Sequence, residues 1–215
     1  MAFDVRPLLA KIGMYRPDLD MATAKLRYCL DEAVRETCRR TFLAREVVAA
    51  TLTAGNRTLT PTLTAGRNLL RVHRLDFLDA DSGEYILVQD ASYYAMRGNS
   101  MEISSTGTSP SYWSQQGSTI RIYPGLVANQ DLQLECSYVP TNEPDEAPLP
   151  ELAVGAVEAK ATELAMLLPG PDRDPKLAML HADRYKRNLG NLKAIGDFGE
   201  VGEVMAYIPP IPGVT

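Results

Sequence analysis

Apolar residues recur at steps of three and four near the start of the chain, and this spacing predicts helices there. A short helical segment is expected over residues 5–12, before Gly13 and Pro17, and a longer helix follows a capping residue at Asp18 or Asp20. The side chains of the longer helix that share one stripe are Met21, Leu26, Cys29, Leu30, Ala33, Val34 and Thr37. Charged residues occupy the opposite side, so we expect this helix to bury one face only.

From Val47 the period changes toward two, and apolar residues alternate with polar ones up to about Val139, which predicts strands. The pentapeptide TLTAG occurs at residues 51–55 and again at 62–66, which suggests neighbouring strands that end in similar glycine turns. Further strands are expected at residues 68–76, 85–89, 101–104, 111–114, 119–122 and 132–138. Several short strands with turns between them indicate a small sandwich or barrel.

Prolines divide the last third of the chain. Residues 141–149 are rich in proline and acidic residues and are expected to form a linker, because proline disrupts helix interiors and central strands. Pro150 suits the first turn of a helix that stops before Pro169, and Asp174 with Pro175 opens the next helix. Beyond Ile195, glycine and proline favour an extended or polyproline conformation, and the residue types alone fit a frayed terminus and a docking arm equally well.

Each predicted amphipathic helix has one apolar stripe and therefore needs a partner. We predict an α+β fold in which N- and C-terminal helices form a helical bundle that carries an inserted antiparallel β-rich domain. The predicted boundaries are residues 1–44 and 150–195 for the bundle, 45–140 for the β-rich insert, 141–149 for the linker and 196–215 for an extended C-terminal arm.

The composition is that of an ordinary globular protein, with 45% hydrophobic and 23% charged residues. No apolar run approaches the roughly 20 residues of a membrane helix, so we expect a soluble protein without a membrane partner that is assembled in the cytoplasm. Three cysteines, at positions 29, 38 and 136, do not form a disulfide framework, and Cys29 and Cys38 are expected in the core.

Motifs of known catalytic and metal sites are absent from the sequence, including phosphate loops, nucleophile elbows and paired CxxC motifs. His73 and His181 lie far apart and are interpreted as packing or surface residues. Asp76, Asp79 and Asp81 surround a turn, where aspartate is favoured by its own backbone hydrogen bonds. We therefore expect no cofactor, no metal and no catalysis, with an unrecognised hydrolase as the less favoured alternative.

One basic group stands out at the end of the longer N-terminal helix: Arg35, Arg39, Arg40 and Arg45. The formal charge of the chain is -5, which argues against tight DNA binding, because binding to phosphates depends on clustered cations. A salt-bridged contact between subunits is the favoured interpretation of this group.

Several segments of the chain resemble phage head-tail connector adaptors, including the tail tubular protein A type of short-tailed phages. The β-region resembles theirs at residues 110–113, in the sequence IRIYP at 120–124 and in LQLECSY at 132–138. Residues 31–38, DEAVRETC, resemble their long N-terminal helix, and two C-terminal helices ending near Tyr185 and Leu189 are similar to theirs. The resemblance covers about residues 4–195.

This resemblance implies a structural virion protein that forms a homo-oligomeric ring of about twelve copies under the portal protein. Helical domains would pack side by side, β-domains would point toward a tail or nozzle protein, and DNA would pass through without tight binding. A neck or tail-completion protein lower in the same assembly is the alternative. The arm is expected to bind the portal or a neighbouring subunit through apolar anchors: Met205, Tyr207, Ile208, Pro209, Pro210 and Ile211.

Overall fold

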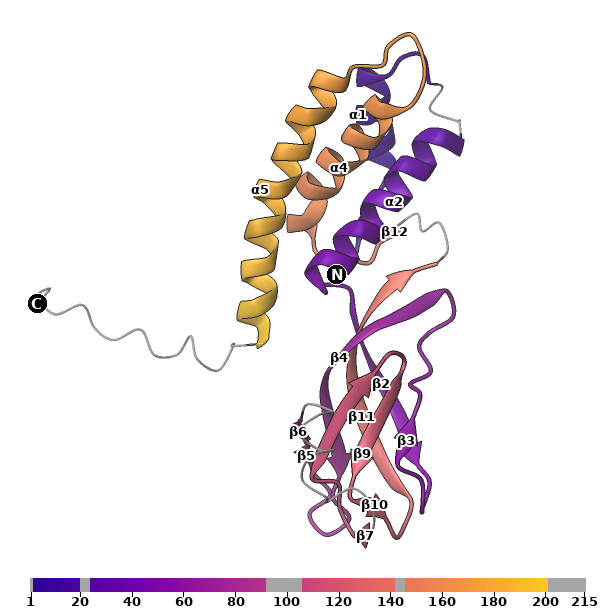
Figure 1. Ribbon diagram of the computed structural model, residues 1–215, viewed down its shortest axis with the longest axis vertical. Coiled ribbons are helices and arrows are strands. Elements are labelled where there is room, and N and C mark those ends of the chain that lie inside the picture. The colour runs from indigo at the N-terminus through magenta and orange to yellow at the C-terminus, as the bar shows by residue number, and fades with distance from the viewer. Residues whose placement is uncertain (1, 20–23, 92–105, 142–145, 201–215) are drawn as a thin grey trace, which may run out of the picture. The chain divides into compact units, whose positions relative to one another are not determined.

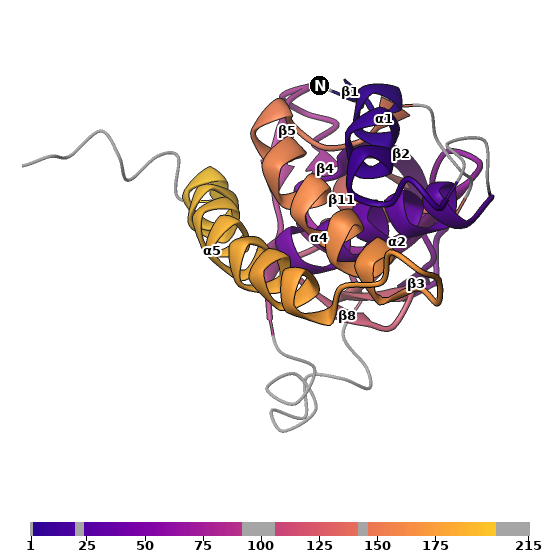
Figure 2. The ribbon, with the colours of Figure 1, turned by 90° about the horizontal axis from the view of Figure 1, so that it is seen from above.

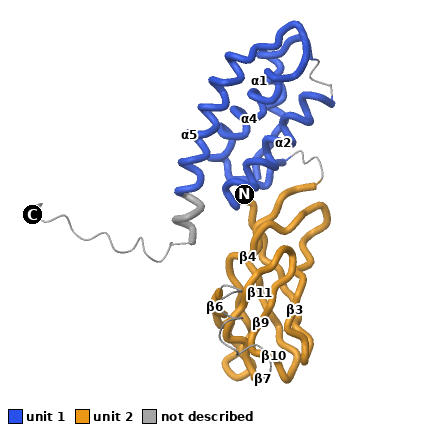
Figure 3. The backbone as a smooth tube through the Cα atoms, in the orientation of Figure 1, with its two compact units in different colours: residues 1–43, 144–215 blue, residues 44–143 orange. Residues whose placement is uncertain are grey.

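A computed structural model describes residues 2–19, 24–91, 106–141 and 146–200, with the backbone alone for 195–200 (Figure 1). The chain forms two compact units, coloured separately in Figure 3. The first, here called the helical unit, comprises residues 1–43 and 144–215, and the second, the β unit, comprises residues 44–143.

The helical unit is built from both ends of the chain. Its helices are α1 (Arg6–Tyr15), α2 (Ala24–Thr41), the 3-10 helix η1 (Glu151–Ala153), α4 (Val154–Leu167) and α5 (Pro175–Glu200). A short antiparallel sheet also joins the two ends, because β1 (Phe3–Asp4) pairs with β12 (Glu146–Ala147).

Helix α4 contacts α1, α2 and α5, and Figure 2 shows it between α5 and α1. Its buried residues cover a broad face of the helix, with Lys160, Glu163 and Leu167 on the remaining side: Ala156, Val157, Glu158, Ala159, Ala161, Thr162, Ala165 and Met166. Alanine is a strong helix former with a small side chain, so α4 forms readily and leaves room for three neighbouring helices.

The C-terminal end of α4 is held by a buried guanidinium. Arg16, which follows α1, donates a hydrogen bond to the carbonyl oxygen of Ala165 and another, at 3.1 Å, to that of Leu168. Asp18 receives two further bonds from Arg16, with Nε–Oδ1 at 2.6 Å and Nη2–Oδ2 at 2.7 Å. These bonds raise the pKa of Arg16 and lower that of Asp18, so both groups remain charged.

Helix α5 begins at the position that the sequence predicts. Asp174 caps it, since its Oδ1 accepts hydrogen bonds from the backbone N–H groups of Lys176 at 2.9 Å and Leu177 at 3.0 Å. Pro175 occupies the first helical position, where its missing N–H costs no hydrogen bond.

The β unit contains two four-stranded sheets. The first has the order β2 (Arg45–Leu52), β11 (Gln130–Pro140), β4 (Arg67–Leu78) and β5 (Tyr85–Leu87). The second has the order β3 (Thr58–Leu59), β9 (Thr119–Tyr123), β8 (Tyr112–Gln116) and β6 (Gln89–Asp90). A further pair joins β10 (Gly125–Leu126) to β7 (Thr106–Gly107).

Both sheets contribute to one apolar core, which includes Leu75 and Leu134 from the first sheet and Trp113 and Ile122 from the second. Trp113 also donates a hydrogen bond from Nε1 to the carbonyl oxygen of Val88, at 3.1 Å. The side-chain amide of Gln115 joins the sheets, because its Oε1 accepts from the N–H of Val72 at 2.8 Å. The buried indole N–H is thus paired, as a packed interior requires.

The predicted fold class is wrong. The chain is a mixed α/β protein whose described strands form four sheets, rather than a helical bundle with an inserted antiparallel domain. Strands β6 and β8 pair in parallel, as do β7 and β10, and β1 and β12 add a sheet among the helices. Hydrophobic periodicity does not report which strands pair or in which direction, so it could not reveal these pairs. The predicted domain boundaries stay a prediction.

Some element predictions also differ from the structure. The first TLTAG segment ends β2 in a turn with Gly55 at φ +80°, whereas the second segment, residues 62–66, is not in a strand. Helix α5 continues to Glu200, whereas an extended conformation is expected from the sequence directly beyond Ile195. The strand expected at residues 101–104 lies outside the described residues.

Gly170 packs against the Arg16–Asp18 pair, and we expect Gly170→Ala to destabilise the protein. An added Cβ would overlap Asp18 Oδ2 and lie 2.7 Å from Arg16 Nη2, so the ion pair must shift at a cost of about 1–3 kcal/mol. The matched control is Gly190→Ala in α5, where a Cβ meets no atom within 4 Å. This change should raise the free energy of unfolding by about 0.5–1 kcal/mol. Urea unfolding of both variants measures the difference, and equal stability of the two would contradict this account.

Candidate subunit-contact site

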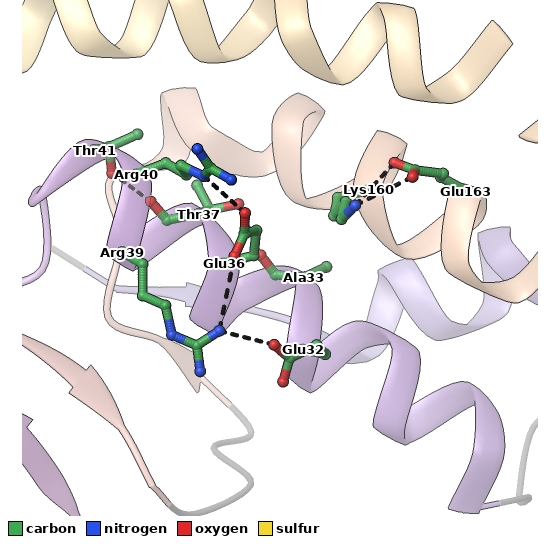
Figure 4. A network of polar contacts seen from close by, with 9 residues as sticks. All are labelled: Glu32, Ala33, Glu36, Thr37, Arg39, Arg40, Thr41, Lys160 and Glu163. Carbon is green, nitrogen blue, oxygen red and sulfur yellow. Dashed lines mark hydrogen bonds and ion pairs between the residues drawn. The ribbon is translucent and has the colours of Figure 1, made fainter. Parts of the chain in front are cut away.

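Helix α2 carries a row of alternating charges on the side opposite its buried face. Arg39 Nη1 lies 2.8 Å from Glu32 Oε1 and 3.7 Å from Glu36 Oε2, and Arg40 Nε lies 2.8 Å from Glu36 Oε1 (Figure 4). Arg35 adds a longer contact of 3.8 Å to Glu32. We call these five residues the α2 ladder. The spacings of three, four and seven residues place them on adjacent turns.

The orientation of the ladder follows from what α2 buries. Leu26, Leu30 and Val34 are fully buried on the other face, and this fixes the rotation of the helix about its axis. The hydroxyls of Thr37 and Thr41 donate to the carbonyl oxygens of Ala33 and Thr37, at 2.7 and 2.8 Å, so both are satisfied inside the helix (Figure 4).

The predicted basic group is divided between the two units. Arg35, Arg39 and Arg40 belong to the α2 ladder, whereas Arg45 lies in β2 and pairs with Glu135 at 2.8 Å. Each of the four cations is therefore neutralised by a carboxylate of the same chain. This arrangement presents alternating charge, which suits a protein surface of alternating charge better than a phosphate backbone.

A second charged arrangement lies where α1 and α5 both border α4. Glu158 of α4 has a side chain only 5% exposed, and its Oε2 accepts a hydrogen bond from Lys11 Nζ of α1 at 2.7 Å. Its Oε1 lies 3.7 Å from Arg184 Nη1 of α5. Two cations from different helices thus compensate one buried carboxylate.

Tyr15 and His181 meet edge to face beside this carboxylate, with ring centroids 5.5 Å apart. His181 is buried, and its Nδ1 has no hydrogen-bond partner. Burial lowers the pKa of His181, and the positive charge of Arg184 lowers it further, against an opposing effect of Glu158. The imidazole is therefore held in its neutral form.

Sequence reasoning missed the buried role of Glu158. An acidic residue among Val157, Ala161 and Ala165 interrupts an apolar helix face, and that interruption was the available signal. The interpretation of His181 as a packing residue is confirmed by its burial.

The cysteines are packed in the two cores, and the prediction that Cys29 and Cys38 are core residues is confirmed. Burial raises the pKa of Cys29 to about 11 and those of Cys38 and Cys136 to about 12. All three therefore remain protonated thiols of low reactivity near neutral pH.

The turn after β4 is stabilised by its own aspartate, as the sequence suggests. Asp79 Oδ2 accepts hydrogen bonds from the backbone N–H of Ser82 at 3.1 Å and from its hydroxyl at 2.7 Å, and these bonds lower the pKa of Asp79. Asp76 instead pairs with Arg74 at 2.8 Å. Among the residues that the structure describes, no group of three or more His, Cys, Asp or Glu side chains is placed to hold a metal ion.

The predicted anchors of the arm cannot be placed. Met205, Tyr207, Ile208, Pro209, Pro210 and Ile211 all lie outside the described residues. Their role in binding a partner stays a prediction.

Comparison with protein families adds the deciding observation. The family model described as SU10 adaptor protein matches residues 4–204, which include both units. The chain belongs to the SU10 adaptor protein family. The predicted resemblance to phage head-tail adaptors is thereby confirmed, and the chain is a structural adaptor of a phage virion. A search of curated proteins found no match.

SU10 adaptors are structural proteins, which is not a class of enzyme. Membership also implies interaction with other virion components. None of the described helices is both long and apolar enough to cross a membrane.

His181 predicts a loss of stability in mild acid. Its folded pKa lies below the ordinary value of about 6.5, so as pH falls through 6.5 the unfolded chain binds a proton that the folded chain resists. The free energy of unfolding should therefore decrease from pH 7 to pH 5. Urea unfolding at a series of pH values measures this slope.

The control for this prediction is His181→Phe, which keeps an aromatic ring against Tyr15 but cannot titrate, with His181→Asn as a second variant. Both should show a flatter pH dependence than the natural chain over the same interval. An unchanged slope in both variants would assign the pH dependence to other groups.

Proposed function

We propose that this SU10 adaptor forms a ring that docks under the portal, joins phage head to tail and surrounds part of the DNA conduit. The observation that carries the proposal is the family match over residues 4–204, because it spans both units rather than one common module. About twelve copies are expected, since a ring built on a portal takes up the symmetry of that portal.

The α2 ladder supports a role for α2 in the contact between subunits. Its charges alternate along the helix and are partly exposed, so a neighbouring subunit with a similar alternation can pair with it. Such contacts fix register more than they add affinity, which suits a ring that assembles on a template.

The distribution of arginine supports passage of DNA without tight binding. Many arginines are paired with carboxylates of the same chain: Arg6, Arg16, Arg27, Arg35, Arg39, Arg40, Arg45, Arg67, Arg74 and Arg184. The net charge of -5 adds a general repulsion between the protein and DNA. A paired guanidinium must lose its carboxylate before it binds a phosphate, so adhesion to passing DNA is weak.

Assembly with the portal tests this function directly. Purified adaptor mixed with the portal protein of the same phage should form stoichiometric rings on one end of the portal in electron micrographs. Rings bound only to a tail component would instead indicate the neck or tail-completion role. The absence of rings with either partner would overturn the proposal.

Arg39→Glu should reduce ring formation while leaving the fold stable. The change places a third carboxylate beside Glu32 and Glu36, but exposed ion pairs contribute only about 0.2–1 kcal/mol to stability. We expect at least a tenfold loss of rings on portal, counted in micrographs, and a small shift in the unfolding midpoint.

Arg6→Glu is the matched control, because Arg6 is also an exposed arginine, paired with Asp4 at 2.8 Å, and lies outside the α2 ladder. It should leave ring formation unchanged. Equal effects of both variants would show that net charge, rather than the α2 ladder, governs assembly.

A further inference from the structure

We propose that the surface shared by α1 and α5 binds the C-terminal segment, residues 201–215, of a neighbouring copy of the chain. This inference rests on the proposed ring, because it names a contact that joins neighbouring subunits. We call the receiving surface the α1–α5 seam, defined by Lys11, Met14, Tyr15, Leu180 and Arg184.

The seam is one continuous surface. Lys11 and Arg184 approach the same carboxylate of Glu158 from the two helices, and one turn further along Tyr15 meets His181. Met14 is next to Tyr15 in the sequence, and Leu180 is next to His181. The five residues therefore flank one stretch of α4.

Apolar side chains on the seam are unusually accessible. Met14 is 80% exposed and Leu180 is 60% exposed, and both are next in sequence to a residue of the Tyr15–His181 contact. Grouped exposed apolar residues with polar neighbours are typical of interaction surfaces. Lys11 and Arg184, each about half exposed, add positive charge on both sides.

The C-terminal segment has the complementary chemistry. Residues 201–215 contain Glu203 but no lysine, arginine or histidine, and Asp197 and Glu200 precede them in α5. Glu203 is followed by apolar residues: Val204, Met205, Tyr207 and Ile208. Glu203 can meet the cations of the seam while the apolar residues cover Met14, Tyr15 and Leu180.

Charge also selects the seam over another exposed apolar surface, on β5. Tyr85, Ile86 and Leu87 are exposed on this edge strand and would otherwise suit an extended segment. Three acidic residues precede them, Asp79, Asp81 and Glu84. An acidic segment is repelled there and attracted by the seam.

Length permits an exchange between copies. The 15 residues after Glu200 span up to about 50 Å when extended, whereas Leu180 lies about 30 Å from the end of α5 at 1.5 Å per residue. A segment that bound its own seam would have to reverse direction and run back along α5. Donation to the next copy makes a head-to-tail contact, which closes into a ring.

Disulfide trapping tests the exchange with full-length chains. A Leu180→Cys chain is mixed with a Met205→Cys chain, alone at high concentration and again with portal, and then mildly oxidised. The three natural cysteines are buried with raised pKa values, so they react little. A disulfide between different chains then reports that residue 205 of one copy reaches the seam of another.

Leu87→Cys replaces Leu180→Cys as the matched control, because Leu87 is 62% exposed but has acidic neighbours. We expect at least fivefold more linked dimer with Leu180→Cys than with Leu87→Cys. Glu203→Lys on the Met205→Cys chain should lower that yield, because it replaces the carboxylate with a cation that Lys11 and Arg184 repel.

Equal yields for the two receiving positions, with and without portal, would overturn the inference. A second experiment uses a doubly substituted chain, Leu180→Cys with Met205→Cys, mixed with portal and with a competitor segment that lacks cysteine. Formation of internal disulfides only would also overturn the inference. Ring formation is scored separately by electron microscopy. Rings without the cross-link would therefore refute the exchange and leave the proposed function intact.

Discussion

The helical unit depends on the small side chains of α4. This helix borders α1, α2 and α5, and it does so because alanine fills half of its buried positions. A larger residue at Ala159 or Ala161, which are both fully buried, would push a neighbouring helix away, since packed interiors tolerate added volume poorly. Because α1 and α5 both approach α4 closely, Lys11 and Arg184 reach the same carboxylate, that of Glu158.

Buried charge adds specificity to this packing. The carboxylate of Glu158 connects α4 to Lys11 of α1. The guanidinium of Arg16, the residue that follows α1, binds carbonyl oxygens at the end of α4. An isolated charge in such a position is strongly unfavourable, so a misaligned α1 would leave both groups uncompensated. Apolar contacts alone would tolerate a slip of one turn more easily. The charged contacts thus select one alignment of the two chain ends.

Local features of the fold were accessible from sequence, and long-range ones were not. The start of α5 at Asp174 and Pro175 and the long strands β4 and β11 follow from capping residues and alternation. Helix α4 was expected to bury one stripe, but alanine is compatible with either environment and the broad buried face of α4 gives little periodic signal. The parallel pairs and the β1–β12 sheet depend on contacts between distant segments, which hydrophobic periodicity does not encode. Of the candidate site, the α2 charges were visible in the sequence, with Glu32 and Glu36 at helical spacing from the arginines, whereas the pairing of Arg45 with Glu135 and the α1–α5 seam required the folded chain.

The helical unit is built from both ends of the chain, and this affects how the protein folds during synthesis. All residues of the β unit are made before α4 begins at Val154, so its two sheets can form while α1 and α2 still lack their main packing partner. The apolar faces of those early helices then stay accessible until the last quarter of the chain leaves the ribosome. Contacts between segments about 150 residues apart, such as Lys11 with Glu158, close late because bringing distant segments together costs chain entropy. A nascent chain that pauses before α4 therefore exposes aggregation-prone helices beside an already folded β unit.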